Sequence, residues 1–324
     1  MTHPFETLSP DRAIDMIETL GFAVGRDPFA LNSYENRVFD FQDDNRRRFI
    51  LKVYRPDRWT RVQRAEELQF IEFLAQSGVS VGTPWQAPDG RVLHRYEDFE
   101  YAIFNALPGQ APELDNPNHL FALGELVGKL HRASKRYSFN ERPVWAPVSL
   151  LEHASSVVLE SAFLSNRQAK VYKKLVMELI DQARTWPLES LAMFPVHGDC
   201  HIGNILGRDD EFGLVDFDDA QTGPAVMDLW LMLTAKEASE AQSQLSELLE
   251  GYEQYLDFDR RELDWVERLR AVRMVRHAAW IVERWSDPAF PAAFSWVGNE
   301  AYWDDHIKAL EQQRHALSDP LWLA

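Results

Sequence analysis

A short segment in the second half of the chain gathers side chains that can do chemistry. It reads His197-Gly198-Asp199-Cys200-His201-Ile202-Gly203-Asn204, and Asp216 follows twelve positions after Asn204. This H-x-D-x-x-x-x-N spacing, with an aspartate in the next loop, is typical of phosphotransferases. A carboxylate such as Asp199 can orient an attacking hydroxyl and take its proton. The amide oxygen of Asn204 and the carboxylate of Asp216 are the hard ligands that Mg²⁺ prefers. The segment therefore predicts phosphoryl transfer from ATP with Mg²⁺.

Two other interpretations of this segment are weaker. Asp, Asn and Gly are common in ordinary turns, but turns do not explain the paired spacings between apolar flanks. His197, Cys200 and His201 are zinc-ligand types, but they lie too close together for a two-pair site, and the chain has no second cysteine. We expect His197 to brace the loop and Cys200 to be an incidental small residue, although a thiol there can make activity sensitive to oxidation.

A second candidate is Lys52, which lies in the apolar run 49–53. An unpaired ammonium in such a strand is costly, and phosphotransferases pair a third-strand lysine with a glutamate of the following helix. Both Glu66 and Glu67 share a helical face with apolar residues, so periodicity does not choose between them. The alternative is an edge-strand lysine whose ammonium reaches solvent. The catalytic segment favours the ion pair.

The elements that position these residues follow from hydrophobic periodicity. In the first third we expect a helix from Ser9-Pro10-Asp11 to Gly21, strands over 38–41, 48–54 and 99–105, a turn at 43–45, and a helix over 60–76 that stops at Gly78. Beyond Leu107-Pro108-Gly109 we expect helices over 117–136, 165–185, 238–256, 260–285 and 299–318 around a β-like stretch at 203–217. The prediction is an α+β, bilobal fold: a small β-rich N-lobe (1–105), a larger helical C-lobe (106–324) and a ligand cleft near residue 105.

Composition excludes several classes of protein. The 324 residues include 34 Lys and Arg against 51 Asp and Glu, giving a net charge of −17, and a single cysteine. That charge disfavours nucleic-acid binding, and one cysteine cannot form an internal disulfide. No apolar run reaches the roughly 18 to 20 residues that a membrane span needs, and MTHPFETLSP does not resemble a secretory signal. We expect a cytoplasmic protein with no membrane or nucleic-acid partner.

Four motifs make the chain resemble one known family. They are Leu31-Asn32-Ser33-Tyr34-Glu35-Asn36-Arg37-Val38, Lys52-Val53-Tyr54-Arg55-Pro56, the segment His197 to His201, and Asp287-Pro288-Ala289-Phe290-Pro291. Together they closely resemble the bacterial stress response kinase A family, a branch of the aminoglycoside phosphotransferase and choline kinase-like superfamily with its protein-kinase-like fold. The resemblance spans about Leu31 to Trp303. It implies a monomeric, cytoplasmic serine/threonine protein kinase that uses ATP and Mg²⁺, phosphorylates itself as well as protein substrates, and acts in stress survival and suppression of programmed cell death.

The resemblance also implies roles for individual residues. It implies that Asp199 is the catalytic base and that Asn204 and Asp216 are Mg²⁺ ligands, with Asp216 sharing the active-site role. It places Ser33 beside the ATP phosphates and makes Lys52 the nucleotide anchor, with Glu67 as its partner. It also implies that Phe104 and Ala106 belong to the hinge segment 104–107 that bonds adenine. The superfamily pattern E-x-x-x-[aliphatic]-x-x-L-A-x-x-G-V fits Glu67 to Val79, which chooses Glu67 over Glu66. His131 is expected to be structural, and Asp228 is expected to pin the catalytic loop.

Two departures from ordinary protein kinases stand out. The phosphate segment 32–36 contains no glycine, so backbone amides and the Ser33 and Asn36 side chains are expected to cover the phosphates. The metal loop reads Asp216-Phe217-Asp218 in place of Asp-Phe-Gly, and no Ala-Pro-Glu motif follows. Peptide docking and activation-loop control by the usual routes are therefore not expected.

Two alternative functions use the same residues. A small-molecule hydroxyl kinase acting on an aminoglycoside, choline or an amino alcohol would suit the acidic composition, because Asp218 and Asp219 could bind a cationic acceptor. A nucleotide-binding pseudoenzyme is disfavoured, because all the key side chains of the site are present. The tryptophans at 265, 280, 285, 296 and 303 are predicted to be core, although the region 283–303 borders the place where superfamily members bind acceptors.

Overall fold

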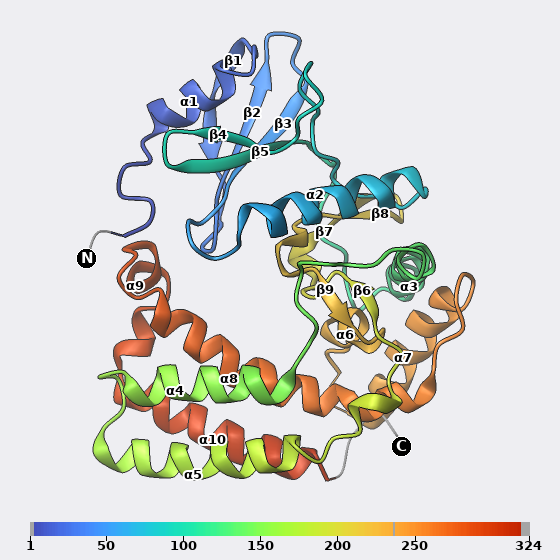
Figure 1. The fold of residues 1–324 in the computed structure, drawn as a ribbon. Helices are drawn as coiled ribbons and strands as arrows, with labels where there is room; N and C mark the ends of the chain where they lie inside the picture. Colours follow the sequence, from blue (N-terminus) through green and yellow to red (C-terminus); the bar gives the residue numbers. More distant parts are fainter. Residues whose placement is uncertain (1–2, 236, 319–324) are drawn as a thin grey trace.

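The computed structural model describes residues 3–235 and 237–318, and Figure 1 shows a sheet-containing part above a helical part. The strands are β1 (Val24–Ala30), β2 (Arg37–Asp43), β3 (Arg48–Val53), β4 (His94–Tyr96) and β5 (Phe99–Asn105). They form one antiparallel sheet in the order β1-β2-β3-β5-β4. The predicted strands correspond to β2, β3 and β5. Strand β1 has no sequence signal, because its mostly exposed residues, one of them a proline, show no buried face.

The two faces of this sheet explain how Lys52 reaches the cleft. Odd-numbered residues of β3 and β5, such as Leu51 and Tyr101, pack in a separate core beneath α1 (Pro10–Glu18), which Ser9 caps as predicted. Successive side chains of a strand point to opposite faces, so Lys52 lies on the other face with its neighbour Ala102 across the ladder. There it meets α2 (Arg61–Gln76), which begins with a capping box on Thr60.

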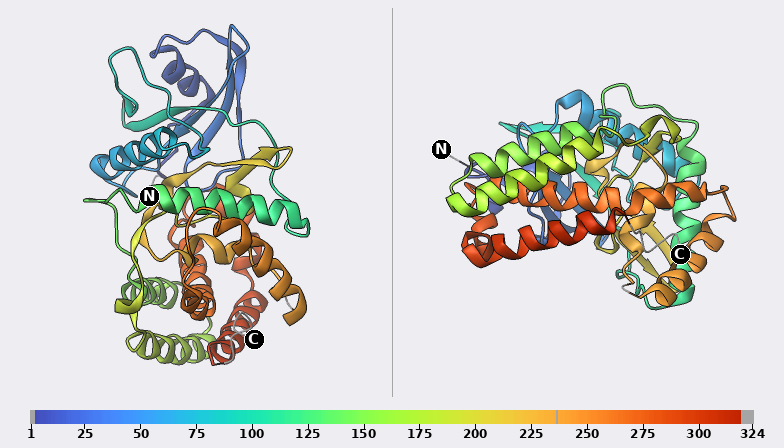
Figure 2. Two further views of the ribbon diagram at one scale, coloured as in Figure 1. Left: turned by 90° about the vertical axis from the view of Figure 1, so that its right-hand side faces the viewer. Right: turned by 90° about the horizontal axis from the view of Figure 1, so that it is seen from below.

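The C-lobe is built from helices (Figure 1). The long ones are α3 (Pro117–Ser134), α4 (Pro147–Glu160), α5 (Asn166–Ala183), α7 (Ala238–Tyr252), α8 (Val266–Glu283) and α10 (Glu300–Ala316). Helices α4, α5, α8 and α10 pack together at the end far from the sheet, as Figure 2 also shows. Helices α3 and α7 pack closely because Gly251 leaves room: a Cβ there would lie 1.9 Å from the Phe121 carbonyl oxygen.

Two differences from the predicted helices have local causes. Helix α4 was not predicted: it has no side-chain cap at Ala146, and its Ser155-Ser156-Val157-Val158 run mixes turn and strand formers. The helix predicted over 260–285 is divided into a 3₁₀ turn, Arg260–Trp265, and α8. Packing of the apolar residues of these segments, such as Leu151 and Val266, into the main core decided both outcomes.

Short strands frame the catalytic segment. Strand β6 (Phe194–Val196) pairs with β9 (Gln221–Gly223), and β7 (Ile205–Arg208) forms a hairpin with β8 (Glu211–Leu214). This hairpin lies within the β-like stretch predicted at 203–217. The segment 197–204 therefore connects β6 to β7, and Asp216 comes just after β8. Both ends of the chemistry-bearing segment are anchored in β-structure, which holds its loop conformation.

One buried carboxylate joins the two parts of the molecule. Asp287 lies between α8 and α9 (Ala289–Ala293), and both of its oxygens accept hydrogen bonds from Arg37 at 2.8 Å. Arg55, just after β3, donates to the same carboxylate at 2.8 Å. Tyr34 also packs against the Phe290 ring. The segment predicted to cover the phosphates is thus tied to the C-lobe.

Strand β5 ends at Asn105, and we keep residue 105 as the proposed boundary between the lobes.

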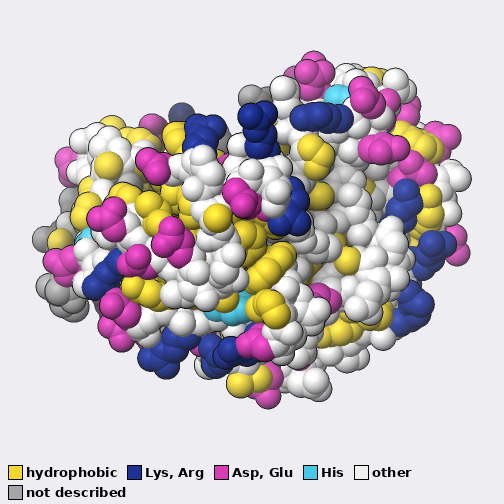
Figure 3. Space-filling view, turned by 90° about the horizontal axis from the view of Figure 1, so that it is seen from above, with side chains coloured by type: hydrophobic (Ala, Val, Ile, Leu, Met, Phe, Trp, Pro, Cys, Tyr) yellow, Lys and Arg dark blue, Asp and Glu magenta, His cyan; other side chains and the backbone are white. Residues whose placement is uncertain are grey.

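Charged side chains are mixed on the face of the molecule seen from the N-lobe side. Figure 3 shows acidic and basic groups interspersed there, so the net charge of −17 does not form a single acidic patch on that face. Within residues 3–235 and 237–318, we find no helix with the length and apolar content that crossing a bilayer requires.

Candidate active site

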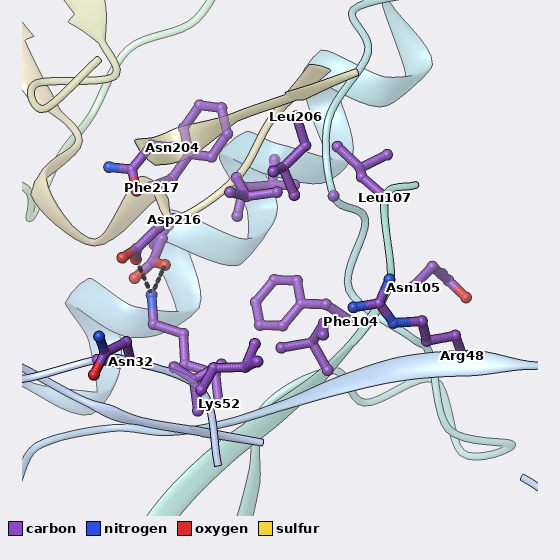
Figure 4. A pocket seen from close by; sticks show the side chains of 18 residues that line it. Asn32, Arg48, Lys52, Phe104, Asn105, Leu107, Asn204, Leu206, Asp216 and Phe217 are labelled. Carbon is purple, nitrogen blue, oxygen red and sulfur yellow. Dashed lines mark hydrogen bonds and ion pairs between the residues drawn. The ribbon is translucent and has the colours of Figure 1, made fainter. Parts of the chain in front are cut away.

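A cavity lies between the two lobes, where the cleft was predicted. Its walls come from the segment 31–33, from β2 and β3, from the stretch 104–107, and from β7 with the loop after β8. Figure 4 shows Phe104 and Leu107 toward one end, and Lys52, Asp216 and Asn204 toward the other. An apolar end suits a planar base, and a polar end suits phosphates.

Lys52 is held by three carboxylates at the polar end of this cavity. Its Nζ lies 2.8 Å from Asp216 Oδ1, 3.2 Å from Glu67 Oε1 and 3.4 Å from Asp218 Oδ1. Burial acts to lower the pKa of Lys52, but these three charges outweigh it and hold the pKa well above its usual value. Burial also raises the pKa of Glu67, which Lys52 opposes. Lys52 is therefore a permanent cation aimed into the cavity (Figure 4).

The neighbouring Glu66 does not contact Lys52 and instead binds the backbone of a loop in the C-lobe. Its carboxylate accepts hydrogen bonds from three consecutive backbone N–H groups, those of residues 140–142, at 2.6 to 2.9 Å. Arg142 then donates to the carbonyl oxygens of Asp218 at 2.6 Å and Ala220 at 2.8 Å. Glu66 thereby fixes the loop that supports the segment after Asp216. The two adjacent glutamates of α2 thus have different partners: Glu67 pairs with Lys52, and Glu66 binds the loop 140–142.

The catalytic loop is pinned from below by Asp228 of α6 (Val226–Leu229). Its carboxylate accepts the backbone N–H groups of His197 at 2.7 Å and Gly198 at 2.8 Å, and it pairs with the buried His131. Burial acts to raise the pKa of Asp228, but hydrogen bonding to His131 and the charges of both histidines lower it. Gly198 has φ +84°, and a Cβ there would lie 2.2 Å from the Asp219 carbonyl oxygen. No other residue type fits this position without moving the backbone.

Asp199 faces the open side of the loop, where its carboxylate has two neighbours. Arg273 of α8 donates to Oδ1 at 2.7 Å, and His201 Nε2 lies 3.5 Å from Oδ2. His201 Nδ1 accepts the Gly203 N–H, which places the proton of neutral His201 on Nε2, toward Asp199. The carboxylate of Asp199 keeps 24% of its side chain exposed, so an incoming hydroxyl can reach it.

Asn204 and Asp216 fit a hard divalent cation. Asn204 Nδ2 donates to the Asp199 carbonyl oxygen at 3.0 Å, which leaves the amide oxygen available as a ligand. Asp216 has a left-handed backbone, φ 59° and ψ 70°, with its side chain 45% exposed at the cavity. Strained backbone of this kind is often found at functional sites. Between residues 3 and 318, position 236 left aside, no cluster of three or more His, Cys, Asp or Glu forms a metal site, so phosphate and water oxygens would complete the shell of Mg²⁺.

The other residues expected at the nucleotide lie as follows. Ser33 and Phe104 line the cavity, whereas Ala106 does not and donates its N–H to the Arg48 carbonyl oxygen at 3.3 Å. Its neighbours Asn105 and Leu107 line the cavity instead. Asn36 was expected to cover phosphates, but its buried side chain accepts the Arg55 N–H at 3.0 Å and does not line the cavity. That expectation was wrong, because the Asn36 side chain instead joins the segment before β2 to the segment after β3.

Sequence reasoning missed the arginines of the site. Arg58 bonds Asp218 through one nitrogen and Asp219 through the other, the latter at 2.7 Å. Burial acts to raise the pKa of Asp218, but Arg58 and Lys52 lower it far below its usual value. The two carboxylates that seemed suited to a cationic acceptor are thus already neutralised. No spacing rule signals such arginines, because their long side chains reach partners more than seventy positions away.

The aromatic carboxyl-terminal third divides between core and cleft. Trp265 and Trp303 are buried, as helical spacing predicts. Trp280 instead donates its Nε1 hydrogen to Glu35 at 2.5 Å, and Trp296 is 41% exposed. Glu35 belongs to the phosphate segment and also pairs with Arg284. The carboxyl-terminal end of α8 therefore braces the phosphate segment.

Glu262 supports α6 from outside the cavity and predicts a pH dependence. Its buried carboxylate accepts the Val226 N–H at 2.9 Å, and burial raises its pKa from 4.5 to about 7. The native state therefore binds more protons than the unfolded chain between these values. This contribution to the free energy of unfolding is fully present below pH 4.5 and is lost as the pH rises through 7.

We expect wild type to lose about 2 to 3 kcal/mol of unfolding free energy relative to Glu262→Gln between about pH 5 and 8. Gln keeps a carbonyl oxygen for the Val226 N–H but does not ionise. Urea unfolding at several pH values measures the difference. Parallel pH profiles for the two proteins would show that Glu262 does not titrate in this range.

Comparisons with known proteins identify the family to which this chain belongs. The model of a family described as "Phosphotransferase enzyme family" matches residues 29–266. "Stress response kinase A" of Escherichia coli strain K12 is 38% identical over 316 residues, which cover 98% of this chain and 95% of that protein. "Serine/threonine protein kinase RdoA" of Salmonella typhimurium strain LT2 is also 38% identical, with the same coverage.

Solved structures share the fold at low identity. An amicoumacin kinase in complex with AMP-PNP and Ca²⁺ has a TM-score of 0.74 at 21% identity, covering 95% of this chain and 93% of that one. A microcompartment-associated aminopropanol kinase has a TM-score of 0.69 at 18% identity, covering 93% and 98%. At these identities the likeness concerns the fold, and it confirms the predicted α+β architecture with an amino-terminal sheet and a mainly helical part.

Proposed function

Because this chain belongs to the phosphotransferase enzyme family and to the stress response kinase A family, we propose that it transfers the γ-phosphoryl group of ATP to Ser or Thr hydroxyls of proteins, itself included. Family membership confirms the predicted resemblance and makes the chain an ATP-dependent phosphotransferase. The proposal extends this to Mg²⁺ dependence, to autophosphorylation, and to a role in bacterial stress survival and restraint of programmed cell death. We propose that it acts as a monomer.

The residues of the cleft support a direct transfer. The Ser or Thr oxygen forms a bond to the γ-phosphorus as the bond to the β-γ bridging oxygen breaks, and ADP leaves. Asp199 orients the hydroxyl and accepts its proton. Lys52, held by Glu67, faces the phosphates, and Ser33 covers them from the segment before β2. Closure of the cleft around the phosphates excludes water, which limits hydrolysis.

Asn204 and Asp216 are the residues that we propose to hold Mg²⁺. When bound, Mg²⁺ supplies positive charge that offsets the charge on the phosphates. The left-handed conformation of Asp216 presents its carboxylate to the cavity, and the hydrogen bond from Asn204 Nδ2 to the Asp199 carbonyl oxygen sets the direction of the amide oxygen. With Asp216 engaged by Mg²⁺, Lys52 would keep Glu67 and Asp218 as partners and could also bind a phosphate oxygen.

One observation favours a protein acceptor over a small cationic alcohol. Asp218 and Asp219 are both bonded to Arg58, and Asp199 is bonded to Arg273. Free carboxylates are the usual partners of the ammonium groups of an aminoglycoside or an amino alcohol, because these groups carry positive charge. The kinases of amicoumacin and aminopropanol share only the fold with this chain, so they do not favour a small acceptor here.

Transfer of labelled phosphate tests the proposal. The purified chain is incubated with γ-labelled ATP and Mg²⁺, together with an acidic protein, a basic protein, or a panel of choline, amino alcohols and aminoglycosides. We expect label on a protein and on the chain itself, and acid hydrolysis should release phosphoserine or phosphothreonine. Label confined to the small alcohols would refute the protein-kinase proposal. Asp199→Asn serves as the negative control for contaminating kinases.

A further inference from the structure

We infer that the acceptor side of the active site binds an acidic peptide segment through Arg276 of α8, next to the Arg273 that bonds Asp199, so that the phosphorylated Ser or Thr has an anionic neighbour in sequence. This inference rests on the proposed protein-kinase activity and specifies its substrate class. The chemistry recognised is a carboxylate or phosphate group next to the acceptor hydroxyl.

One face of α8 is directed at the catalytic loop. Arg273, Arg276 and His277 stand at positions i, i+3 and i+4, so their side chains share a face of the helix. The bond from Arg273 to Asp199 at 2.7 Å fixes where this face points. Arg276 therefore lies about one helical turn from the residue that contacts the catalytic carboxylate.

Arg276 has no fixed partner. Within residues 3–235 and 237–318, no hydrogen bond or ion pair to its guanidinium is found, and its side chain is exposed. Surrounding protein atoms nonetheless lower its pKa; Asp219 opposes this effect, while Arg58 and Arg273 add to it. The guanidinium is thus reachable from solvent but crowded by protein and by like charges. An anion would relieve that repulsion.

The carboxylates near Arg276 are not ion-pair partners of its guanidinium. Asp219 is bonded to Arg58, Asp199 to Arg273, and Glu35 to Arg284 at 2.6 Å. Each already has a cation of its own, so the positive charge of Arg276 stays available for a ligand. The acceptor side is therefore basic in a chain whose net charge is −17.

The chemistry and spacing of the site fit a peptide. A guanidinium binds carboxylate or phosphate through two parallel hydrogen bonds. The three residues from Arg273 to Arg276 advance about 4.5 Å along the helix, and an extended peptide advances about 3.3 to 3.6 Å per residue. The anionic side chain is therefore expected within about two residues of the acceptor. His277 packs beside the Trp280 ring, and burial lowers its pKa, so near pH 7 it adds a hydrogen-bonding group without charge.

Matched peptides test this inference. Three serine peptides are compared that are identical except for Glu, Gln or Lys at the two positions on each side of the serine. We expect kcat/KM to fall in the order Glu, Gln, Lys. In Arg276→Glu the ratio of kcat/KM for the Glu and Lys peptides should fall at least about tenfold, mainly through KM, because like charges then meet at the acceptor.

Two further proteins make the result specific. Lys173→Glu reverses an exposed charge on α5 and gives the same net charge as Arg276→Glu, so it should leave the peptide ratio as in wild type. Arg276→Gln removes the charge without adding one, and thermal melts of all variants confirm folding. Arg276→Gln should give a ratio of kcat/KM for the Glu and Lys peptides between those of wild type and Arg276→Glu.

Each outcome has a separate meaning. A wild-type preference for the Lys peptide, or a ratio unchanged in Arg276→Glu, overturns the inference while the protein-kinase proposal stands. If no peptide or protein is phosphorylated but glycerol 3-phosphate is, the protein-kinase proposal and the peptide form of this inference both fail. Anion recognition by Arg276 then remains, and Arg276→Glu should abolish use of glycerol 3-phosphate.

Discussion

Asp199→Asn is expected to lower the rate of phosphoryl transfer by about 10²- to 10⁴-fold, the range that a positioned acid or base contributes. ATP binding should stay near the wild-type value, because Asp199 does not line the nucleotide cavity. The asparagine keeps an oxygen for Arg273, so the loop should hold its conformation. Single-turnover transfer to a protein substrate and calorimetric binding of ATP measure the two effects separately.

The matched control for Asp199 is Asp305→Asn, which makes the same chemical change at an exposed position of α10. It should leave both transfer and ATP binding unchanged. A transfer rate in Asp199→Asn within about threefold of wild type would remove Asp199 from the role of base. Weakened ATP binding with an intact rate would point instead to a nucleotide ligand.

Asp216→Asn should abolish the dependence of ATP binding on Mg²⁺. In wild type we expect affinity for ATP to rise when Mg²⁺ is added, because a carboxylate and an amide hold the cation beside the phosphates. The variant offers only neutral oxygens, so ATP should bind equally with and without Mg²⁺, and transfer should be lost. Lys52 keeps Glu67 and Asp218 as partners, so the fold should be stable. Calorimetric titration in both conditions measures this.

Asp210→Asn is a close control for Asp216→Asn. Asp210 is exposed in the β7–β8 hairpin and, like Asp216, has a left-handed backbone, with φ 63°. Asn tolerates this conformation as well as Asp does. The control separates loss of a ligand from an effect on the backbone. A Mg²⁺ response retained in Asp216→Asn would mean that another group holds the cation.

The active-site segment was predictable because it is local. Residues 197–204 are contiguous, so covalent connection keeps Asp199 and Asn204 near each other. Lys52 was predictable from its place in the apolar run 49–53, because an ammonium there needs an ion-pair partner. Helix starts such as Ser9 and Thr60 were also predictable from local sequence, since a cap bonds backbone only two or three positions away.

What the sequence by itself determined about this protein is therefore its family, its two-part architecture and the spacing of its reactive groups, all of which local pattern encodes. The tertiary structure alone decided the partners of long charged side chains. Arg58, Arg273 and Asp287 have no periodic signature, and each bonds a residue more than seventy positions away. Several carboxylates compete for each guanidinium, and only packing of the helices against the sheet decides which one lies within reach.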